Sequence, residues 1–315
     1  MTDRPSPRWR TWLTLAVCAA ALLVVVWATL TAWGGIAHGH PAYAVLLGVT
    51  IAVCALVAVL AVRSRTREPR QGAWRLVGRI AVIALVVGWI ALIAWLAPHT
   101  AVEPATSAMA SDSSVTVVET PSDITFTPAA GSSGPGVFFQ PGALVDARAY
   151  AAVLRPLAQA GHTVVITKQP LGIAFLALGA LDRVASQHPE IDTWVVGGHS
   201  LGGTVAAIES TADGAADVSG LLLFASYPAS DISDANLAVA SISGTEDGLS
   251  TPAKIEDSRA NLPASTLFIA IDGASHAQFG SYGQQAGDGT PTISNEDARQ
   301  QIADASVEFV GSVGR

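Results

Sequence analysis

The sequence predicts an α/β fold whose mainly parallel sheet is covered by helices on both faces, preceded by three transmembrane helices. Three observations lead to this prediction. Long apolar runs fill the first third of the 315-residue chain. Short apolar segments then alternate with helix-like segments through the remainder, as in parallel sheets that are buried on both faces. Within that remainder, a serine with a glycine two residues away on each side stands between an apolar segment and a helical one.

The three apolar runs cover residues 12–33, 42–62 and 80–97, and none of them contains a charged residue. Each run is close to the roughly 20 residues that an α-helix needs to cross a bilayer. A core helix of a water-soluble domain usually has a polar face, and these runs have none. Tryptophans gather near their ends, as interfacial anchors do; they are Trp9, Trp12, Trp33, Trp74 and Trp95. We therefore expect a membrane domain over residues 1–97.

Arginines indicate how this domain is oriented. They precede the first run and crowd the loop between the second and third runs, whereas the loop 34–41 has neither lysine nor arginine. The positive-inside rule places the N-terminus and the loop 63–79 in the cytoplasm. Three crossings then predict a multi-pass protein of the cell membrane in which everything after Pro98 is extracytoplasmic. The histidines of the first loop, His38 and His40, are more typical of a polar turn than of a metal site.

Composition changes after Pro98. Proline, alanine, serine, threonine and acidic residues dominate residues 98–114, which predicts a flexible linker to a globular domain over residues 115–315. After Pro98 the chain has eight lysines and arginines against 23 acidic residues, a balance that repels nucleic acid. Both cysteines, Cys18 and Cys54, lie in apolar runs, which excludes a disulfide, a cysteine nucleophile and a thiolate metal site from the globular domain.

Strand-like and helix-like segments alternate through the globular domain. The predicted strands are 115–118, 137–139, 163–166, 194–197, 221–225, 238–242 and 266–271. The predicted helices are 147–159, 173–186, 204–209, 252–260 and 295–310. In such a sheet, functional groups gather in the loops at the carboxyl ends of the strands.

Ser200 is the candidate nucleophile because Gly198-His199-Ser200-Leu201-Gly202 has the pattern G-x-S-x-G between a strand and a helix. The turn is so sharp that strand and helix nearly touch, which only glycine permits at the two flanking positions. The turn also leaves the N–H of Leu201 free at a helix N-terminus, where it can stabilise an oxyanion.

A serine hydroxyl needs a base to take its proton, and the base needs a carboxylate to orient it. His276 follows the strand 266–271 in a loop at the carboxyl edge, whereas the side chain of His199 is expected to point away into the elbow. Asp247 follows the strand 238–242, so the order along the chain is serine, acid, histidine. Glu246 is a close alternative to Asp247, and Asp272 is a weaker one.

The second oxyanion donor is expected in the loop after the strand 137–139. Pro141 has no N–H, which leaves Gly142 or Ala143 as the donor, and we favour Ala143. The long, glycine-rich loop 279–289 after the base either forms a rim of the substrate pocket or binds a cation through Asp288; surface loops of this composition are commonly only turns.

Four stretches together resemble the α/β-hydrolase superfamily, in particular its bacterial dienelactone-hydrolase-like, alpha/beta hydrolase fold-5 branch. They are Pro141-Gly142-Ala143-Leu144-Val145-Asp146, Gly198-His199-Ser200-Leu201-Gly202-Gly203, Gly244-Thr245-Glu246-Asp247-Gly248 and His276-Ala277-Gln278-Phe279-Gly280. The resemblance spans most of residues 115–310 and implies an α/β-hydrolase fold and ester hydrolysis through an acyl-enzyme, with no metal or cofactor. Gln140-Pro141-Gly142 departs from the His-Gly of many members. A serine nucleophile argues against the dienelactone reaction itself, which uses cysteine.

The leading hypothesis is thus a membrane-anchored extracytoplasmic serine hydrolase that acts on a small-molecule or lipid-like carboxylic ester. Two alternatives stay open. The acyl-enzyme could pass its acyl group to an alcohol of the cell envelope instead of water, because the motifs do not separate hydrolase from transferase. The domain could also be a non-catalytic binding module on a hydrolase fold, although such modules typically lose one member of the catalytic set.

Overall fold

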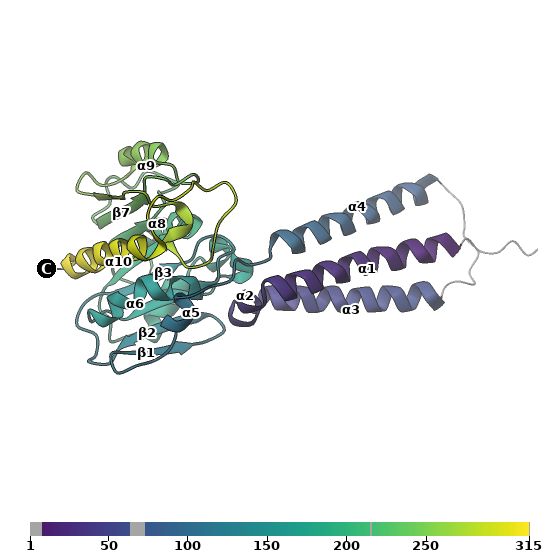
Figure 1. Cartoon of the computed structure of the whole chain (residues 1–315), viewed down its shortest axis with the longest axis horizontal. Helices are drawn as coiled ribbons and strands as arrows, with labels where there is room; N and C mark the ends of the chain where they lie inside the picture. Colours follow the sequence, from purple (N-terminus) through teal and green to yellow (C-terminus); the bar gives the residue numbers. More distant parts are fainter. Residues whose placement is uncertain (1–7, 64–72, 215, 315) are drawn as a thin grey trace, which may run out of the picture. The chain divides into compact units, whose positions relative to one another are not determined.

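A computed structural model describes residues 8–63, 73–214 and 216–314 (Figure 1). Arg4 and the loop arginines Arg65, Arg67 and Arg70, on which the predicted orientation partly depends, lie outside the described residues. The chain divides into two compact units, one over residues 1–37 and 41–97 and the other over residues 38–40 and 98–315.

The first unit consists of helices. Its helices are α1 (Arg8–Thr31), α2 (Trp33–His38, whose last residue is grouped with the second unit), α3 (Ala42–Arg63) and α4 (Ala73–Trp95). Within the described residues, two stretches are long and apolar enough to cross a membrane, Thr11–Thr31 and Ala42–Arg63. The apolar stretch of α4, Ala81–Trp95, is shorter. The structure thus gives two apolar candidates rather than three clear transmembrane helices, because α4 begins with a segment that contains Arg75 and Arg79.

Polar contacts join helices of this unit to one another. The Tyr43 hydroxyl donates to the Ile93 carbonyl at 2.8 Å, and the Trp89 indole N–H donates to the Thr50 hydroxyl at 3.0 Å. Many large apolar side chains of α1, α3 and α4 are exposed, with Leu30 at 78%. Apolar surface exposed on this scale marks a site that contacts another protein or a membrane. The two long apolar helices suggest that it contacts a membrane.

The second unit contains an eight-stranded sheet. Its strands are β1 (Val115–Glu119), β2 (Asp123–Pro128), β3 (Gly136–Gln140), β4 (Val164–Thr167), β5 (Trp194–His199), β6 (Val218–Phe224), β7 (Ala238–Gly244) and β8 (Leu267–Ile271). Their order in the sheet is β1-β2-β4-β3-β5-β6-β7-β8. β1, β2 and β4 pair antiparallel, and every pairing from β4 through β8 is parallel. The predicted mainly parallel sheet is confirmed.

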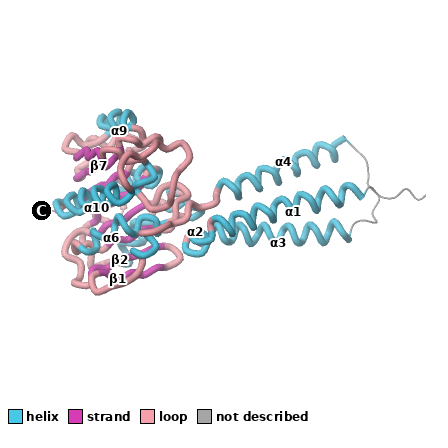
Figure 2. Tube along the Cα trace, viewed as in Figure 1, coloured by secondary structure: helices cyan, strands magenta, loops and turns pink. Residues whose placement is uncertain are grey.

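Helices cover both faces of this sheet (Figures 1 and 2). One face packs on α5 (Ala105–Ala108), α6 (Ala151–Gln159) and α10 (Asn295–Ser312), and the other on α7 (Ala180–Gln187) and α8 (Leu201–Ser210). Neighbouring residues of one strand serve opposite cores: Val137 and Phe139 face the first, and Phe138 faces the second. Helix α9 (Pro252–Ser258) and the short 3₁₀ helices η2 (Ala147–Tyr150), η3 (Pro170–Gly172), η4 (Ala174–Ala177), η5 (Arg259–Asn261) and η6 (His276–Phe279) complete the unit.

Residues 98–114 differ from the flexible linker that we expected. Ala101 and Ala105 are buried in the core of the second unit. His99 forms a parallel bridge with Val145: its N–H donates to the Leu144 carbonyl at 2.7 Å, and its carbonyl accepts from the Asp146 N–H at 3.0 Å. A run of proline, alanine and serine looks like a tether in sequence, but here its backbone bonds to the loop after β3.

Two further elements differ from the sequence prediction. Strand β2 was not expected; its alternating residues Ile124 and Phe126 are buried against the sheet. The predicted helix 173–186 is two pieces, η4 and α7, because Gly179 between them adopts a positive φ of 82°. The break leaves an irregular segment at the carboxyl end of β4.

Candidate active site

Ser200 occupies the sharp turn between β5 and α8. Its φ of 52° and ψ of −125° lie in a region that non-glycine residues rarely adopt. Hydrogen bonds hold this backbone on both sides: the Ser200 N–H donates to the Phe224 carbonyl at 3.0 Å. The Ser200 carbonyl accepts from the Ser226 hydroxyl at 2.6 Å and from the N–H groups of Gly203 and Thr204 at 3.0 and 3.2 Å. Across the described ranges of the chain, the Ser200 hydroxyl makes no hydrogen bond. The turn is thus fixed through its main chain, and its side chain is left available.

The two glycines of the motif are required by close backbone contacts. A Cβ atom on Gly198 would overlap the main chain of Gly202 and Gly203. A Cβ atom on Gly202 would overlap the carbonyl groups of Gln140 and Pro141. Strand β5, helix α8 and the loop after β3 therefore meet backbone to backbone around Ser200.

Asp247 and His276 form a buried pair at the carboxyl ends of β7 and β8. His276 Nδ1 lies 2.8 Å from Asp247 Oδ2, and both side chains are fully buried. Asp247 Oδ1 accepts the N–H groups of Leu249 and Ser250 at 2.8 and 2.7 Å. Because a carboxylate only accepts hydrogen bonds, His276 carries its proton on Nδ1, which leaves the Nε2 lone pair free to act as a base.

The alternative carboxylates lie elsewhere. Glu246 is exposed, and its N–H donates to the Ala274 carbonyl, in the loop that carries His276, at 2.9 Å. Asp272 is also exposed and accepts from the Thr245 hydroxyl at 3.3 Å. The structure therefore brings Asp247, and neither alternative, to the histidine.

His276 Nε2 is buried and has no hydrogen-bond partner among the residues that the structure describes. The His276 ring packs against His199, with ring centroids 4.5 Å apart. Because His199 immediately precedes Ser200, this contact places the His276 ring beside the turn that carries Ser200. A catalytic hydrogen bond to the serine is often loose in a structure without substrate. The His199 side chain, expected to point away, is instead part of this cluster.

The loop after β3 supplies the candidate oxyanion donors. The Gly142 N–H donates to the Tyr150 hydroxyl at 2.9 Å and is therefore engaged, which corrects its place among the candidates. The N–H groups of Ala143 and Leu201 have no hydrogen bond to any described residue, and both residues are partly exposed. These two free amides remain as the candidates for an oxyanion hole.

Tyr150 connects the oxyanion loop to the elbow. Its hydroxyl lies 2.8 Å from His199 Nδ1 while it accepts from Gly142. Burial raises the pKa of Tyr150, so the phenol keeps its proton and donates a hydrogen bond to His199 Nδ1. Burial first, and then the nearby His276, lower the pKa of His199 well below its ordinary value. His199 is therefore a neutral acceptor at physiological pH.

A second polar network supports the oxyanion loop. The Gln169 amide donates to the Pro141 carbonyl and to Gln140 Oε1, each at 2.9 Å, and the Gln140 amide donates to Glu209 Oε2 at 2.8 Å. Burial raises the pKa of Glu209. Sequence reasoning missed this network and the role of Tyr150, because the partners come from separate segments and form no motif.

Comparison with known families gives a match over half of the chain. The model of the family described as "Alpha/beta hydrolase family" matches residues 136–300. Among solved structures, the chain is similar to a dienelactone hydrolase from Anabaena variabilis ATCC 29413 at 16% identity and a TM-score of 0.47, covering 64% of this chain and 100% of that one. It is similar to an alpha/beta hydrolase enzyme from the metagenome of sediments of the lagoon of Mar Chica, Morocco, at 15% identity and a TM-score of 0.45, covering 61% and 98%. A search of curated proteins found no match.

Proposed function

The chain belongs to the alpha/beta hydrolase family, and from this premise we propose that it is a membrane-anchored serine hydrolase that cleaves a carboxylic ester through an acyl-enzyme. The observation that carries the proposal is the buried pair of Asp247 and His276, 2.8 Å apart beside the elbow that presents Ser200. A pair of this kind, with a free Nε2 and two free amides nearby, has the parts that acyl transfer needs.

In the proposed reaction, Ser200 Oγ attacks the ester carbonyl while His276 Nε2 takes the hydroxyl proton. The N–H groups of Leu201 and Ala143 stabilise the oxyanion, and Asp247 stabilises the imidazolium. His276 then gives its proton to the departing alcohol, which leaves an acyl group on Ser200. Water, deprotonated by His276, releases the carboxylic acid in the second half of the cycle.

An exposed apolar segment near the oxyanion loop favours an ester with an apolar acyl group. Phe175, Leu176 and Leu178 are 45%, 53% and 51% exposed, at the carboxyl end of β4. The same segment is tied to the oxyanion loop, because the Leu144 N–H donates to the Gly172 carbonyl at 2.7 Å. Surface apolar side chains are commonplace singly, but three within four residues beside a candidate site suggest a contact for acyl carbons.

Reaction of the full-length protein with a fluorophosphonate probe tests the nucleophile. We expect the parent protein to be labelled and Ser200→Ala to be unlabelled, because the probe reacts only with an activated serine. Ser226→Ala is not a suitable control because its hydroxyl holds the elbow, so Ser233→Ala, at a half-buried position, serves instead. Equal labelling of Ser200→Ala and the parent would refute the assignment.

The proposal extends to location: three crossings by α1, α3 and α4 would put the catalytic unit outside the cytoplasm. Support comes from the apolar length of α1 and α3 and from the arginine distribution. A fluorescent protein that matures only in the cytoplasm, fused to the C-terminus, should stay dark. Bright fluorescence would place the catalytic unit inside the cell and contradict this part of the proposal.

A further inference from the structure

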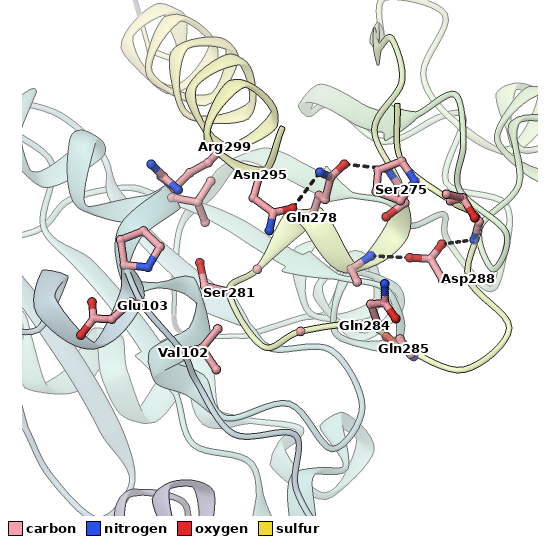
Figure 3. Close-up of a pocket in the computed structure, with 18 residues that line it drawn as sticks. Val102, Glu103, Ser275, Gln278, Ser281, Gln284, Gln285, Asp288, Asn295 and Arg299 are labelled. Carbon is pink, nitrogen blue, oxygen red and sulfur yellow. Dashed lines mark hydrogen bonds between the residues drawn. The ribbon is translucent and has the colours of Figure 1, made fainter. Parts of the chain in front are cut away.

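Asp288, labelled in Figure 3, lies in the loop after His276, and its carboxylate accepts four backbone N–H groups. Oδ1 accepts from Gly248 at 3.2 Å, from His276 at 3.0 Å and from Gly289 at 2.7 Å. Oδ2 accepts from Ala277 at 2.8 Å. One donor belongs to the residue after Asp247, and two belong to His276 and the residue after it. A single side chain therefore bonds to both the loop that carries Asp247 (the acid loop) and the loop that carries His276 (the base loop).

The Asp288 loop fits tightly against the acid loop. A Cβ atom on Gly248 would lie 2.6 Å from the Gly289 nitrogen and 2.7 Å from the Gly287 carbonyl oxygen, closer than real Cβ atoms approach. Gly287 itself has a positive φ of 85°, which favours glycine. The glycines on both sides of Asp288 thus let the carboxylate reach the backbone of both catalytic loops.

The charge of Asp288 suits this role. Burial raises the pKa of the carboxyl group, but the four N–H donors outweigh it and lower the pKa below its ordinary value. The group is ionised at neutral pH, so its hydrogen bonds are charge-assisted and stronger than neutral ones. Because both oxygens already face N–H donors, Asp288 is not arranged as the cation ligand considered from the sequence.

A cavity borders the loop that carries His276, which gives a reason for the hydrogen bonds from Asp288 to that loop. The pocket in Figure 3 has a volume of about 410 Å³ and is lined by Ser275, Ala277, Gln278 and Asp288, among other residues. Close-packed side chains would otherwise hold a loop in place, and here one side of it faces open space. Other polar support is present at the edges of this loop: Ser275 and Gln278 form a capping box, and the Gln278 amide donates to Asn295 Oδ1 at 2.8 Å. Just before His276, the Ala274 carbonyl accepts from the Glu246 N–H at 2.9 Å, and Asp288 adds side-chain bonds between the two loops to this backbone bond.

We propose that Asp288 is a positioning residue that fixes the backbone of the Asp247 loop relative to that of the His276 loop, and so maintains the hydrogen bond between these two side chains. The inference rests on the proposed function, because it assigns Asp288 to the same acid–base pair. Asp288 does not touch the reacting atoms in this role and acts only through the two loops that it joins.

The test compares Asp288→Ala and Asp288→Asn with Asp112→Asn in the full-length protein in detergent. Asp112 is the control because its carboxylate also accepts backbone N–H groups, those of Ser114 and Val115, whereas among the described residues it makes no hydrogen bond to the Asp247 or His276 loop. It also pairs with Arg155, at 2.8 Å. Two readouts are measured: kcat and KM for a p-nitrophenyl ester, and the low-field NMR signal of the His276 Nδ1 proton bonded to Asp247.

We expect Asp288→Ala to lower kcat on the order of 10- to 100-fold with KM changed less than about twofold, as small misplacements of catalytic groups do. The Nδ1 proton signal should shift or vanish. Asp288→Asn should lose less because it keeps the Oδ1 acceptor for three of the four donors, and Asp112→Asn should change neither readout.

Unchanged kcat and an unchanged Nδ1 signal in Asp288→Ala would overturn the inference, as would an equal loss in Asp112→Asn. If Asp288→Ala does not fold, Asp288→Asn decides by the same two readouts. Should the parent protein have neither ester turnover nor a labelled Ser200, the proposed function fails. The Nδ1 signal would still report whether Asp288 holds the pair together.

Discussion

Ser200 and the pair of Asp247 and His276 lie at the same edge of one sheet, yet different forces hold them. Around Ser200, three backbone segments touch where Gly198 and Gly202 leave no room for a side chain. Around the acid and the base, three loops are joined by hydrogen bonds, with a cavity beside them. The nucleophile half should therefore respond to added volume, and the acid–base half to lost hydrogen bonds.

Among the predictions that test this difference, the largest change in activity is expected from Asp247→Asn. The Asn amide would face His276 Nδ1 and favour the tautomer with its proton on Nε2, so the base would be lost. We expect turnover to fall about 10⁴-fold, while the melting temperature changes little because Oδ1 still accepts from Leu249 and Ser250. Glu246→Gln, at the exposed neighbouring position, is the matched control and should stay within about twofold of the parent in kcat/KM. A larger loss in Glu246→Gln than in Asp247→Asn would reverse the assignment of the acid.

Gly202→Ala tests the nucleophile half through volume alone. The new methyl group would collide with main-chain carbonyls of Gln140 and Pro141, which cannot rotate away. We expect at least about 3 kcal/mol of lost stability, the upper range for overpacking, measured by urea unfolding of the full-length protein. Gly311→Ala, in helix α10 with open space around it, should be neutral or stabilising. Equal stability of the two variants would contradict the conclusion that close backbone contacts around Gly202 fix the elbow.

Tyr150→Phe tests the connection between the halves. It removes the acceptor of the Gly142 N–H and the donor to His199, and leaves both groups buried without a partner. The expected cost is about 1–3 kcal/mol of stability, together with a fall in kcat, because the oxyanion loop loses an anchor. Tyr282→Phe is the control, since within the described part of the chain that hydroxyl bonds to the Gln285 side chain alone. If chemical denaturation gives the two variants the same free energy of unfolding, the Tyr150 hydrogen bonds do not contribute to stability as proposed.

The smallest effect is expected at the apolar segment, outside both halves. Replacing Phe175 by serine should lower kcat/KM for long-chain esters several-fold and leave acetyl esters unchanged, since each buried methylene contributes up to about 0.8 kcal/mol. Leu267→Ser, an exposed apolar position at the amino end of β8, is the control. A chain-length profile that stays the same in Phe175→Ser would exclude this segment as the acyl contact.

The two halves also differ in how far sequence could predict them. The elbow is one contiguous stretch whose glycine spacing follows from sterics, so its strand, turn and helix could be predicted together. The mainly parallel sheet followed from its continuous apolar strands. The positions of Asp247 and His276 could be proposed only because both follow strands and their chain order is limited.

What could not be predicted depends on contacts between distant segments. Asp288 lies 40 residues from Gly248, and Gln140 lies 69 residues from Glu209. No local pattern in the sequence indicates such pairs. Gly142 was a reasonable oxyanion donor until the position of the Tyr150 hydroxyl was known. Strand β2 and the packed course of residues 98–114 were missed because their composition resembles that of loops.

The bridge between His99 and Val145 bears on how the second unit could be separated from the proposed membrane anchor. Many surface enzymes are shed when a protease cuts an exposed stalk. Here the chain that leaves α4 becomes part of the wall of the catalytic unit within four residues, and it stays there through Ala105. Cleavage between residues 99 and 114 would therefore separate the catalytic unit from buried residues that pack beside the loop after β3. A soluble version intended to retain activity has to keep this piece and begin before His99.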